Sequence, residues 1–159
     1  MTRAIYAGSF DPITCGHVDI VMRAKKLFEE VVIGVIQNPE KEPFFPLSER
    51  IALIRQVFDG TPGIEIEGFQ GLLVNFAQEK QVFTLVRGLR AVSDFDFEFQ
   101  MALTNRSLNP QMDTVFLMTD HAYSYLSSSL VKQLAQLGAD VSPFVPAQVK
   151  IALEKKCHD

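Results

Sequence analysis

Five short apolar runs alternate with longer segments of helical periodicity along this chain. The runs are residues 4–8, 31–36, 64–69, 83–88 and 114–118. Runs this short and this apolar are typical of strands covered on both faces, and their alternation with helices is typical of a parallel sheet. The sequence therefore predicts an α/β fold of the Rossmann-like, doubly wound kind, with a five-stranded, mostly parallel sheet and helices on both faces.

Apolar residues three or four positions apart predict the helices between these strands. Two core-facing stripes contain Val21, Ala24, Leu27 and Phe28 after His17, and Leu47, Ile51, Ile54 and Phe58 further along. Residues 72–80 and 130–138 predict two more helices, the second ended by Gly138 in the C-cap position. A final helix is expected after Pro146.

The segment DFDFEF, residues 94–99, alternates like a half-buried strand, but we interpret it as the first turns of a helix. Ser93 is a suitable N-cap, and acids in the first turn suit the helix dipole. We expect Phe95 and Phe99 on the core side, with Phe97 and Met101 sharing another face. An apolar outer face indicates a subunit interface, and ordinary core packing is the alternative.

Composition limits the class of protein. The chain has 159 residues, of which 47% are apolar and 21% charged, as in soluble globular proteins, and we expect one domain. A net charge of −4 argues against bulk nucleic acid as the main partner. No segment is apolar enough to span a membrane, and MTRAIYAG lacks the long apolar region of a secretory signal, so we expect a cytoplasmic protein. Cys15 and Cys157 show neither disulfide nor zinc-site spacing.

The decapeptide GSFDPITCGH, residues 8–17, follows the first strand and leads into the first helix. In doubly wound sheets, ligands bind at the carboxyl ends of the strands. The decapeptide has neither the P-loop pattern nor GxGxxG. A helix N-terminus with Gly16 and His17 can still hold phosphate, through free N–H groups, the helix dipole and an imidazole donor. Alone, such a histidine is more often a cap or a surface group.

Further motifs support a phosphate-binding site at this position and indicate which kind of protein carries it. TCGH resembles the T/HxGH signature of the nucleotidyltransferase superfamily. Four segments, residues 6–20, 38–45, 87–100 and 115–132, together resemble the bacterial phosphopantetheine adenylyltransferases in order and spacing. The resemblance implies a single nucleotidyltransferase domain over residues 1–159. It also implies transfer of the adenylyl group of ATP to 4′-phosphopantetheine, giving dephospho-coenzyme A and pyrophosphate in coenzyme A biosynthesis.

The resemblance also implies the site residues. Those with catalytic roles are His17, Lys41 and Arg90. Those that bind ATP are Ser9, Phe10, His17, Gly88, Leu89, Arg90, Glu98, Tyr123, Ser124, Tyr125, Leu126, Ser127, Ser128 and Ser129. Those that bind phosphopantetheine are Ser9, Lys41, Leu73 and Arg87. It further implies Mg²⁺ accompanying ATP and a homohexamer, leaves room for feedback by coenzyme A, and implies no nucleic-acid or membrane partner.

Each of these residues also has an ordinary structural interpretation. Lys41 could be a solvated loop residue, Arg87 and Arg90 surface ion pairs, and the serines N-caps. In this sequence Ala7, Ser9 and Glu42 stand where the family commonly has proline, threonine and a second basic residue. Two other functions remain alternatives. One is transfer of a nucleotide to another phosphate or choline-like acceptor, and the other is a non-catalytic nucleotide-binding module.

Overall fold

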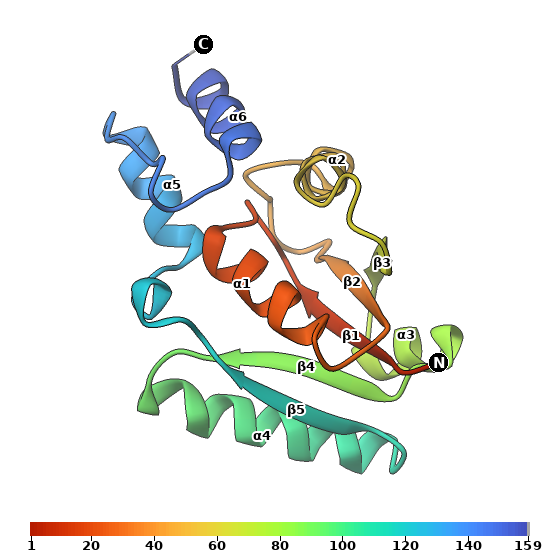
Figure 1. Ribbon diagram of the computed structural model, residues 1–159. Coiled ribbons are helices and arrows are strands. Elements are labelled where there is room, and N and C mark those ends of the chain that lie inside the picture. Colours follow the sequence, from red (N-terminus) through yellow and green to blue (C-terminus); the bar gives the residue numbers. More distant parts are fainter. Residues whose placement is uncertain (159) are drawn as a thin grey trace.

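A computed structural model describes residues 1–158, apart from the side chains of residues 92 and 93 (Figure 1). The strands are β1 (Arg3–Gly8), β2 (Glu30–Gln37), β3 (Ile64–Gln70), β4 (Thr84–Leu89) and β5 (Asp113–Met118). The helices are α1 (Cys15–Ala24), α2 (Leu47–Val57), α3 (Leu73–Lys80), α4 (Val92–Leu108), the short 3₁₀ helix η1 (His121–Tyr123), α5 (Ser128–Gln136) and α6 (Ala147–His158).

The five strands form one sheet in the order β3-β2-β1-β4-β5, and all four neighbouring pairs are parallel. The predicted fold class is therefore confirmed. The chain builds outward from β1 to β3 and then crosses to β4 on the other side of β1. Loops that follow β1 and β4 thus diverge at this point, which leaves room for a ligand at the carboxyl edge.

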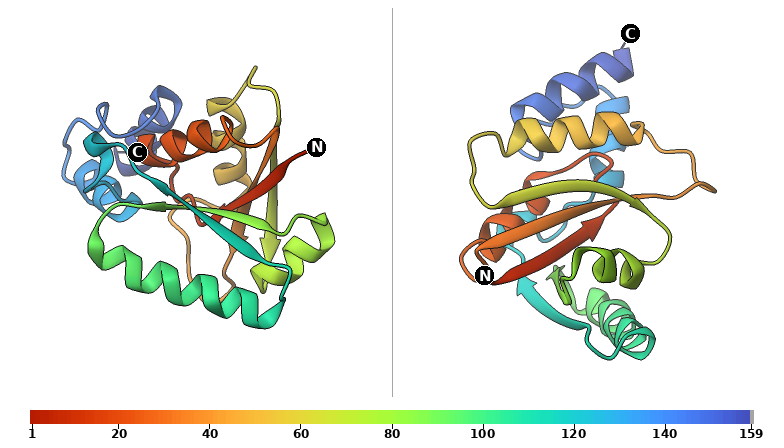
Figure 2. Two further views of the ribbon diagram at one scale, coloured as in Figure 1. Left: turned by 60° about the horizontal axis from the view of Figure 1, so that its bottom comes forward. Right: turned by 90° about the vertical axis from the view of Figure 1, so that its right-hand side faces the viewer.

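Two apolar layers cover the sheet. Along β1, Ala4 and Tyr6 face one core while Ile5 and Ala7 face the other, as expected for side chains that alternate along a strand. The first core is covered by α1, α2, α5 and α6, and the second includes buried residues of α3. The right-hand view of Figure 2 shows the two groups on opposite sides of the sheet, with α4 on the side of α3.

The predicted helical stripes need small corrections. Helix α1 ends at Ala24, and the chain turns there, so Leu27 is 57% exposed rather than part of the core. In α2, Ile54 is fully buried and Phe58 packs in the core just after the helix. Gly138 follows the C-cap residue of α5 by one position, with φ 82°, a conformation that glycine adopts without strain.

Helix α4 is a helix as predicted, but its orientation differs from the prediction. It begins at Val92 with Ala91 in the N-cap position, so the assignment of Ser93 as the N-cap is wrong; the side chain of Ser93 lies outside the described residues. Phe95 and Phe99 are 46% and 48% exposed and stack on each other, with 5.6 Å between ring centroids. Their placement on the core side is also wrong, because buried Glu98 instead faces the sheet.

Candidate active site

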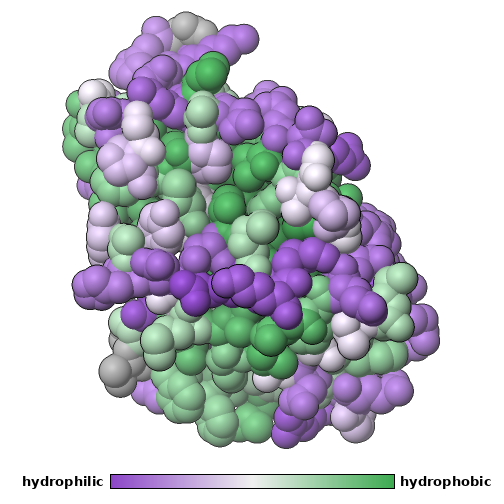
Figure 3. Space-filling model, viewed as in Figure 1, coloured by the Kyte–Doolittle hydropathy of each residue, from purple (hydrophilic) through white to green (hydrophobic). Residues whose placement is uncertain are grey.

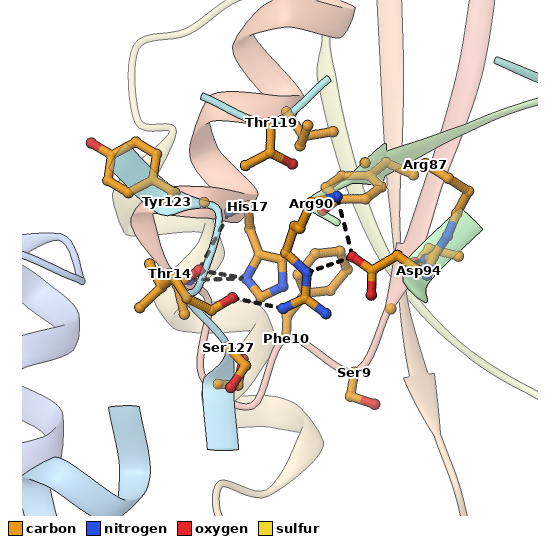
Figure 4. A pocket seen from close by; sticks show the side chains of 18 of the residues that line it. Ser9, Phe10, Thr14, His17, Arg87, Arg90, Asp94, Thr119, Tyr123 and Ser127 are labelled. Atoms are coloured by element: carbon orange, nitrogen blue, oxygen red, sulfur yellow. Dashed lines mark hydrogen bonds and ion pairs between the residues drawn. The ribbon is translucent and has the colours of Figure 1, made fainter. Parts of the chain in front are cut away.

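A polar cavity of about 270 Å³ lies at the carboxyl ends of β1 and β4. Its walls come from the decapeptide, the start of α1, the end of β4, the first turns of α4, and the segment from Thr119 to Ser128. Figure 4 shows His17 and the guanidinium of Arg90 close together in this cavity, with Ser9 and Ser127 to either side. Residues from three of the four motif segments, 6–20, 87–100 and 115–132, therefore meet in this cavity.

His17 is fixed as a neutral hydrogen-bond donor. The backbone N–H of Thr14 donates to Nδ1 of His17 at 3.0 Å, and the Thr14 hydroxyl accepts from the His17 backbone N–H at 3.4 Å, which completes a capping box. Since Nδ1 accepts, Nε2 carries the proton of the neutral ring. Burial, and then the charges of Arg87 and Arg90, lower the pKa of His17 from 6.5 to about 4. The ring is held against the edge of Phe10, with 5.0 Å between centroids.

Arg87 and Glu98 form a two-bonded ion pair at the back of the cavity. Nε and Nη2 of Arg87 donate to the two carboxylate oxygens of Glu98 at 2.9 and 2.7 Å, and Nη1 donates to the carbonyl of Ala7 at 2.8 Å. Burial alone would lower the pKa of Arg87, but the hydrogen bonds and charge of Glu98 outweigh it and raise that pKa. The pair joins β4 to α4 and leaves further N–H groups of Arg87 free for an anion.

Arg90 is held across the mouth of the cavity. Its backbone N–H and Nε both donate to Asp94 at 3.1 Å, and its Nη1 donates to the carbonyl of Leu126 at 2.7 Å. These bonds fix the direction of the guanidinium before a ligand arrives. Preorganised donors of this kind cost no rearrangement when an anion binds.

The serine-rich segment enters the site only in part. Tyr123, Leu126, Ser127 and Ser128 line the polar cavity. Ser127 also caps α5 by accepting from the N–H of Leu130 at 3.1 Å. Four residues that were predicted to contact the nucleotide do not line this cavity: Leu89, Ser124, Tyr125 and Ser129. Gly88, also predicted, does line the cavity.

An apolar cavity of about 540 Å³ adjoins the polar one. Its lining includes Ile36, Phe69, Leu73, Phe97, Met101 and Leu108. The two cavities share a wall formed by Ala7, Gly8, Ser9, Arg87 and Glu98. A ligand with a polar phosphate head and an apolar arm could therefore place its head at Ser9 and Arg87 and its arm beside Leu73.

Lys41 lies in an outer cavity of about 690 Å³, together with Asp11, Arg50, Ser129 and Lys132. Ser9 lines this cavity as well as the other two. The structure thus brings Ser9, His17, Arg87 and Arg90 together, while Lys41 remains exposed on the loop between β2 and α2.

Sequence reasoning missed several residues that organise the site. Asp94 holds Arg90, Thr14 holds His17, and Arg50 holds the loops after β1 and β2. One signal was available for Arg50, since it is four positions before Ile54 and thus on the apolar stripe of α2, where an unpaired charge is costly.

Comparisons with known proteins place the chain in a family. A profile described as cytidylyltransferase-like matches residues 5–134. Over 156 residues, the chain is 54% identical to the phosphopantetheine adenylyltransferase of Alkaliphilus metalliredigens, covering 98% of this chain and 99% of that one. It is 50% identical to the enzyme of that name from Clostridium kluyveri, with 98% and 95% coverage. The chain belongs to the phosphopantetheine adenylyltransferase family. It is therefore a nucleotidyltransferase, and the resemblance seen in the motifs is confirmed.

A third member of the family and a solved structure are also similar to the chain. The Caldanaerobacter subterraneus subsp. tengcongensis phosphopantetheine adenylyltransferase is 49% identical to the chain, covering 98% of each. A Vibrio parahaemolyticus structure, named as a nicotinate-nucleotide adenylyltransferase, superposes with a TM-score of 0.72 over 99% of this chain and 95% of that one. Its sequence identity is 15%, so this likeness concerns the fold.

The described residues contain no group of three His, Cys, Asp or Glu side chains placed to hold a metal ion. The acids of the polar cavity, Asp94 and Glu98, are bonded to Arg90 and Arg87 instead. Over residues 1–158, no helix combines the length and apolar character that crossing a membrane requires.

Proposed function

We propose that this chain transfers the adenylyl group of ATP to 4′-phosphopantetheine, forming dephospho-coenzyme A and releasing pyrophosphate. Its relatives carry the name of this enzyme. The observation that carries the proposal is the wall of Ser9 and Arg87 shared by a polar and an apolar cavity. In this arrangement the phosphates of two anionic substrates can meet while the apolar arm of one lies beside Leu73.

In the proposed reaction, an oxygen of the acceptor phosphate attacks the α-phosphorus of ATP in line. A new P–O bond forms, the bond between the α-phosphorus and the bridging oxygen breaks, and pyrophosphate leaves. A phosphate monoester is already anionic near neutral pH, so positioning and charge stabilisation are the main requirements. We assign Nε2 of His17 as a donor to the transferred phosphate, and Arg90 as a cation facing the phosphates.

Each of the other predicted site residues is assigned to one of the two substrates. Ser9 and Arg87 would hold the acceptor phosphate, together with Lys41, which lines the outer cavity that Ser9 also borders. The remaining ATP contacts are proposed for Phe10, Gly88, Leu89, Glu98 and the segment from Tyr123 to Ser129. Mg²⁺ would enter bound to the phosphates of ATP, as this ion commonly does, because the acids of the cavity are already bonded to arginines.

The direct test is the release of pyrophosphate from ATP and Mg²⁺ on addition of 4′-phosphopantetheine. We expect turnover with this acceptor and at least tenfold lower kcat/KM with phosphocholine or nicotinate mononucleotide, which lack the apolar arm. Faster turnover with one of those compounds would assign a different acceptor. Nucleotide binding without turnover on any acceptor would indicate a non-catalytic module.

We also propose that the whole chain is one nucleotidyltransferase domain, that it acts in the cytoplasm, and that it assembles as a homohexamer. The exposed apolar residues of α4 support an assembled state, because their burial would be favourable. Coenzyme A contains both halves of the proposed product, so it could occupy the same site. Lower turnover when coenzyme A is added to the assay would indicate feedback inhibition.

A further inference from the structure

Arg50 of α2 is a buried cation that bonds to three separate segments. The residue is 3% exposed. Nε donates to the carbonyl of Phe45 at 3.0 Å, and Nη1 donates to the carbonyls of Ser9 and Ile36 at 2.8 and 2.9 Å. These carbonyls belong to the loop after β1, the end of β2, and the end of the loop that carries Lys41. Burying a charge is costly unless its hydrogen bonds are satisfied. The three carbonyls therefore have to be in place for Arg50 to be buried.

Asp11 completes the connection from the opposite side. Its carboxylate oxygens accept from the backbone N–H groups of Phe44 and Phe45, both at 2.8 Å. Arg50 donates a hydrogen bond to the carbonyl of the same residue, Phe45. Phe45 is therefore held at both its N–H and its C=O, which ties the base of the Lys41 loop to the decapeptide.

The bond to Ser9 determines where the next N–H points. In a planar trans peptide the C=O of one residue and the N–H of the next point in opposite directions. Because the Ser9 carbonyl points to Arg50, the N–H of Phe10 points away from Arg50. Phe10 itself lines the polar cavity. Phe10 has φ 47°, a left-handed conformation that a non-glycine residue adopts only when its surroundings impose it. Within the described part of the chain, the Phe10 N–H has no hydrogen-bond acceptor.

We propose that Arg50 is a positioning residue for adenylyl transfer, acting through the Ser9–Phe10 peptide to aim the Phe10 N–H at the phosphates and through Phe45 to anchor the Lys41 loop. This inference rests on the proposed function. It assigns a role to a residue outside the motif segments, and that role is exerted through backbone groups of other residues. A misaimed donor is more harmful in the transition state, where charge develops, than in substrate binding.

The test compares Arg50→Lys and Arg50→Gln with Arg55→Lys and Arg55→Gln, which change an exposed arginine of the same helix. A lysine keeps the charge but cannot reproduce three bonds in the fork geometry of a guanidinium. We expect both Arg50 variants to lower kcat by about 10- to 100-fold while KM for ATP changes less than threefold. Both Arg55 variants should match the wild type.

A second measurement does not depend on turnover. In protein labelled with ¹⁵N-phenylalanine, the Phe10 amide signal, assigned with Phe10→Tyr, should shift on addition of pyrophosphate. In folded Arg50→Lys that shift should be lost or at least halved. If the wild type shows this shift, Arg50→Lys loses it, and the wild type transfers no adenylyl group, the proposed function fails while the orienting role of Arg50 stands. Unchanged kcat in Arg50→Lys, equal changes of kcat and KM, or an identical Phe10 shift in both proteins would each overturn the inference.

Discussion

At the scale of single residues, the site is built from donors whose direction is fixed before any ligand binds. Thr14 sets the proton of His17 on Nε2, Asp94 sets the direction of Arg90, and Glu98 sets that of Arg87. Thr14 is uncharged, and Asp94 and Glu98 are acidic. Arg90 and Arg87 are therefore held in place by groups that do not repel them. The neutral state of His17 follows from burial and from the two arginines nearby.

The lowered pKa of His17 makes stability depend on pH. Unfolded chains take up a proton on this residue near pH 6.5, whereas the folded protein does so near pH 4. Its contribution to folding is therefore lost progressively as the pH falls from 6.5 to 4. Between pH 7 and 4.5, the wild type should lose about 2 kcal/mol more unfolding free energy than His17→Asn. Urea denaturation at both pH values measures this, and equal losses would contradict it.

The sequence motifs predicted which residues gather at one edge of the sheet, but not the partners that hold them there. The convergence of Ser9, His17, Arg87 and Arg90 on one cavity follows from a parallel sheet whose carboxyl edge gathers their loops. The pairing of Arg87 with Glu98 could not be read from periodicity, because it depends on how α4 sits against β4.

At the scale of helices and strands, the sheet was the most predictable part of the molecule. Each predicted strand agrees with the structure to within one residue at both ends, because apolar runs end where the chain leaves the core. The rotation of α4 was not predictable in the same way. Glu98 and Asn105, two turns apart, face inward, and Phe97 and Phe99 therefore lie about 100° to either side.

Close packing between β2 and α3 gives a test at this scale. A Cβ added at Gly34 would lie 2.9 Å from the ring of Phe76 and 3.1 Å from that of Phe69, which stack in parallel. Gly34→Ala should therefore lower the unfolding free energy by about 1–3 kcal/mol, since overpacking forces neighbours to move. Urea denaturation measures the loss.

Gly16→Ala is the matched control. Its Cβ would meet nothing closer than 3.5 Å, so it should unfold at nearly the urea concentration of the wild type. If Gly34→Ala is as stable as that control, the contact between β2 and α3 is looser than described.

At the scale of the whole molecule, one surface is unusually apolar. The lower part of Figure 3, over α4 and β5, is largely green. The exposed large residues there are Phe95, Phe97, Phe99, Met101, Leu103, Leu108 and Met118. Sequence reasoning expected only Phe97 and Met101 on an outer face, because it placed the other phenylalanines of α4 in the core. The wider patch strengthens the proposal of an assembled state.

Light scattering tests this proposal through the mass in solution. We expect about six times the 17.8 kDa of one chain, and a lower mass for Phe97→Glu and Leu103→Glu, because each would bury a charge at an interface. Ile151→Glu changes an exposed apolar residue of α6 and should leave the mass unchanged. A wild-type mass equal to that of one chain would rule out the homohexamer.

The wall shared by the polar and apolar cavities also affects inhibition. Because Ser9 and Arg87 border both, a molecule shaped like the joined product would exclude both substrates at once. Its two halves would bind as tethered ligands, with the second half at a high effective concentration once the first is seated. Such a bridging compound should therefore bind far more tightly than either half alone, without needing any contact that the separate substrates lack.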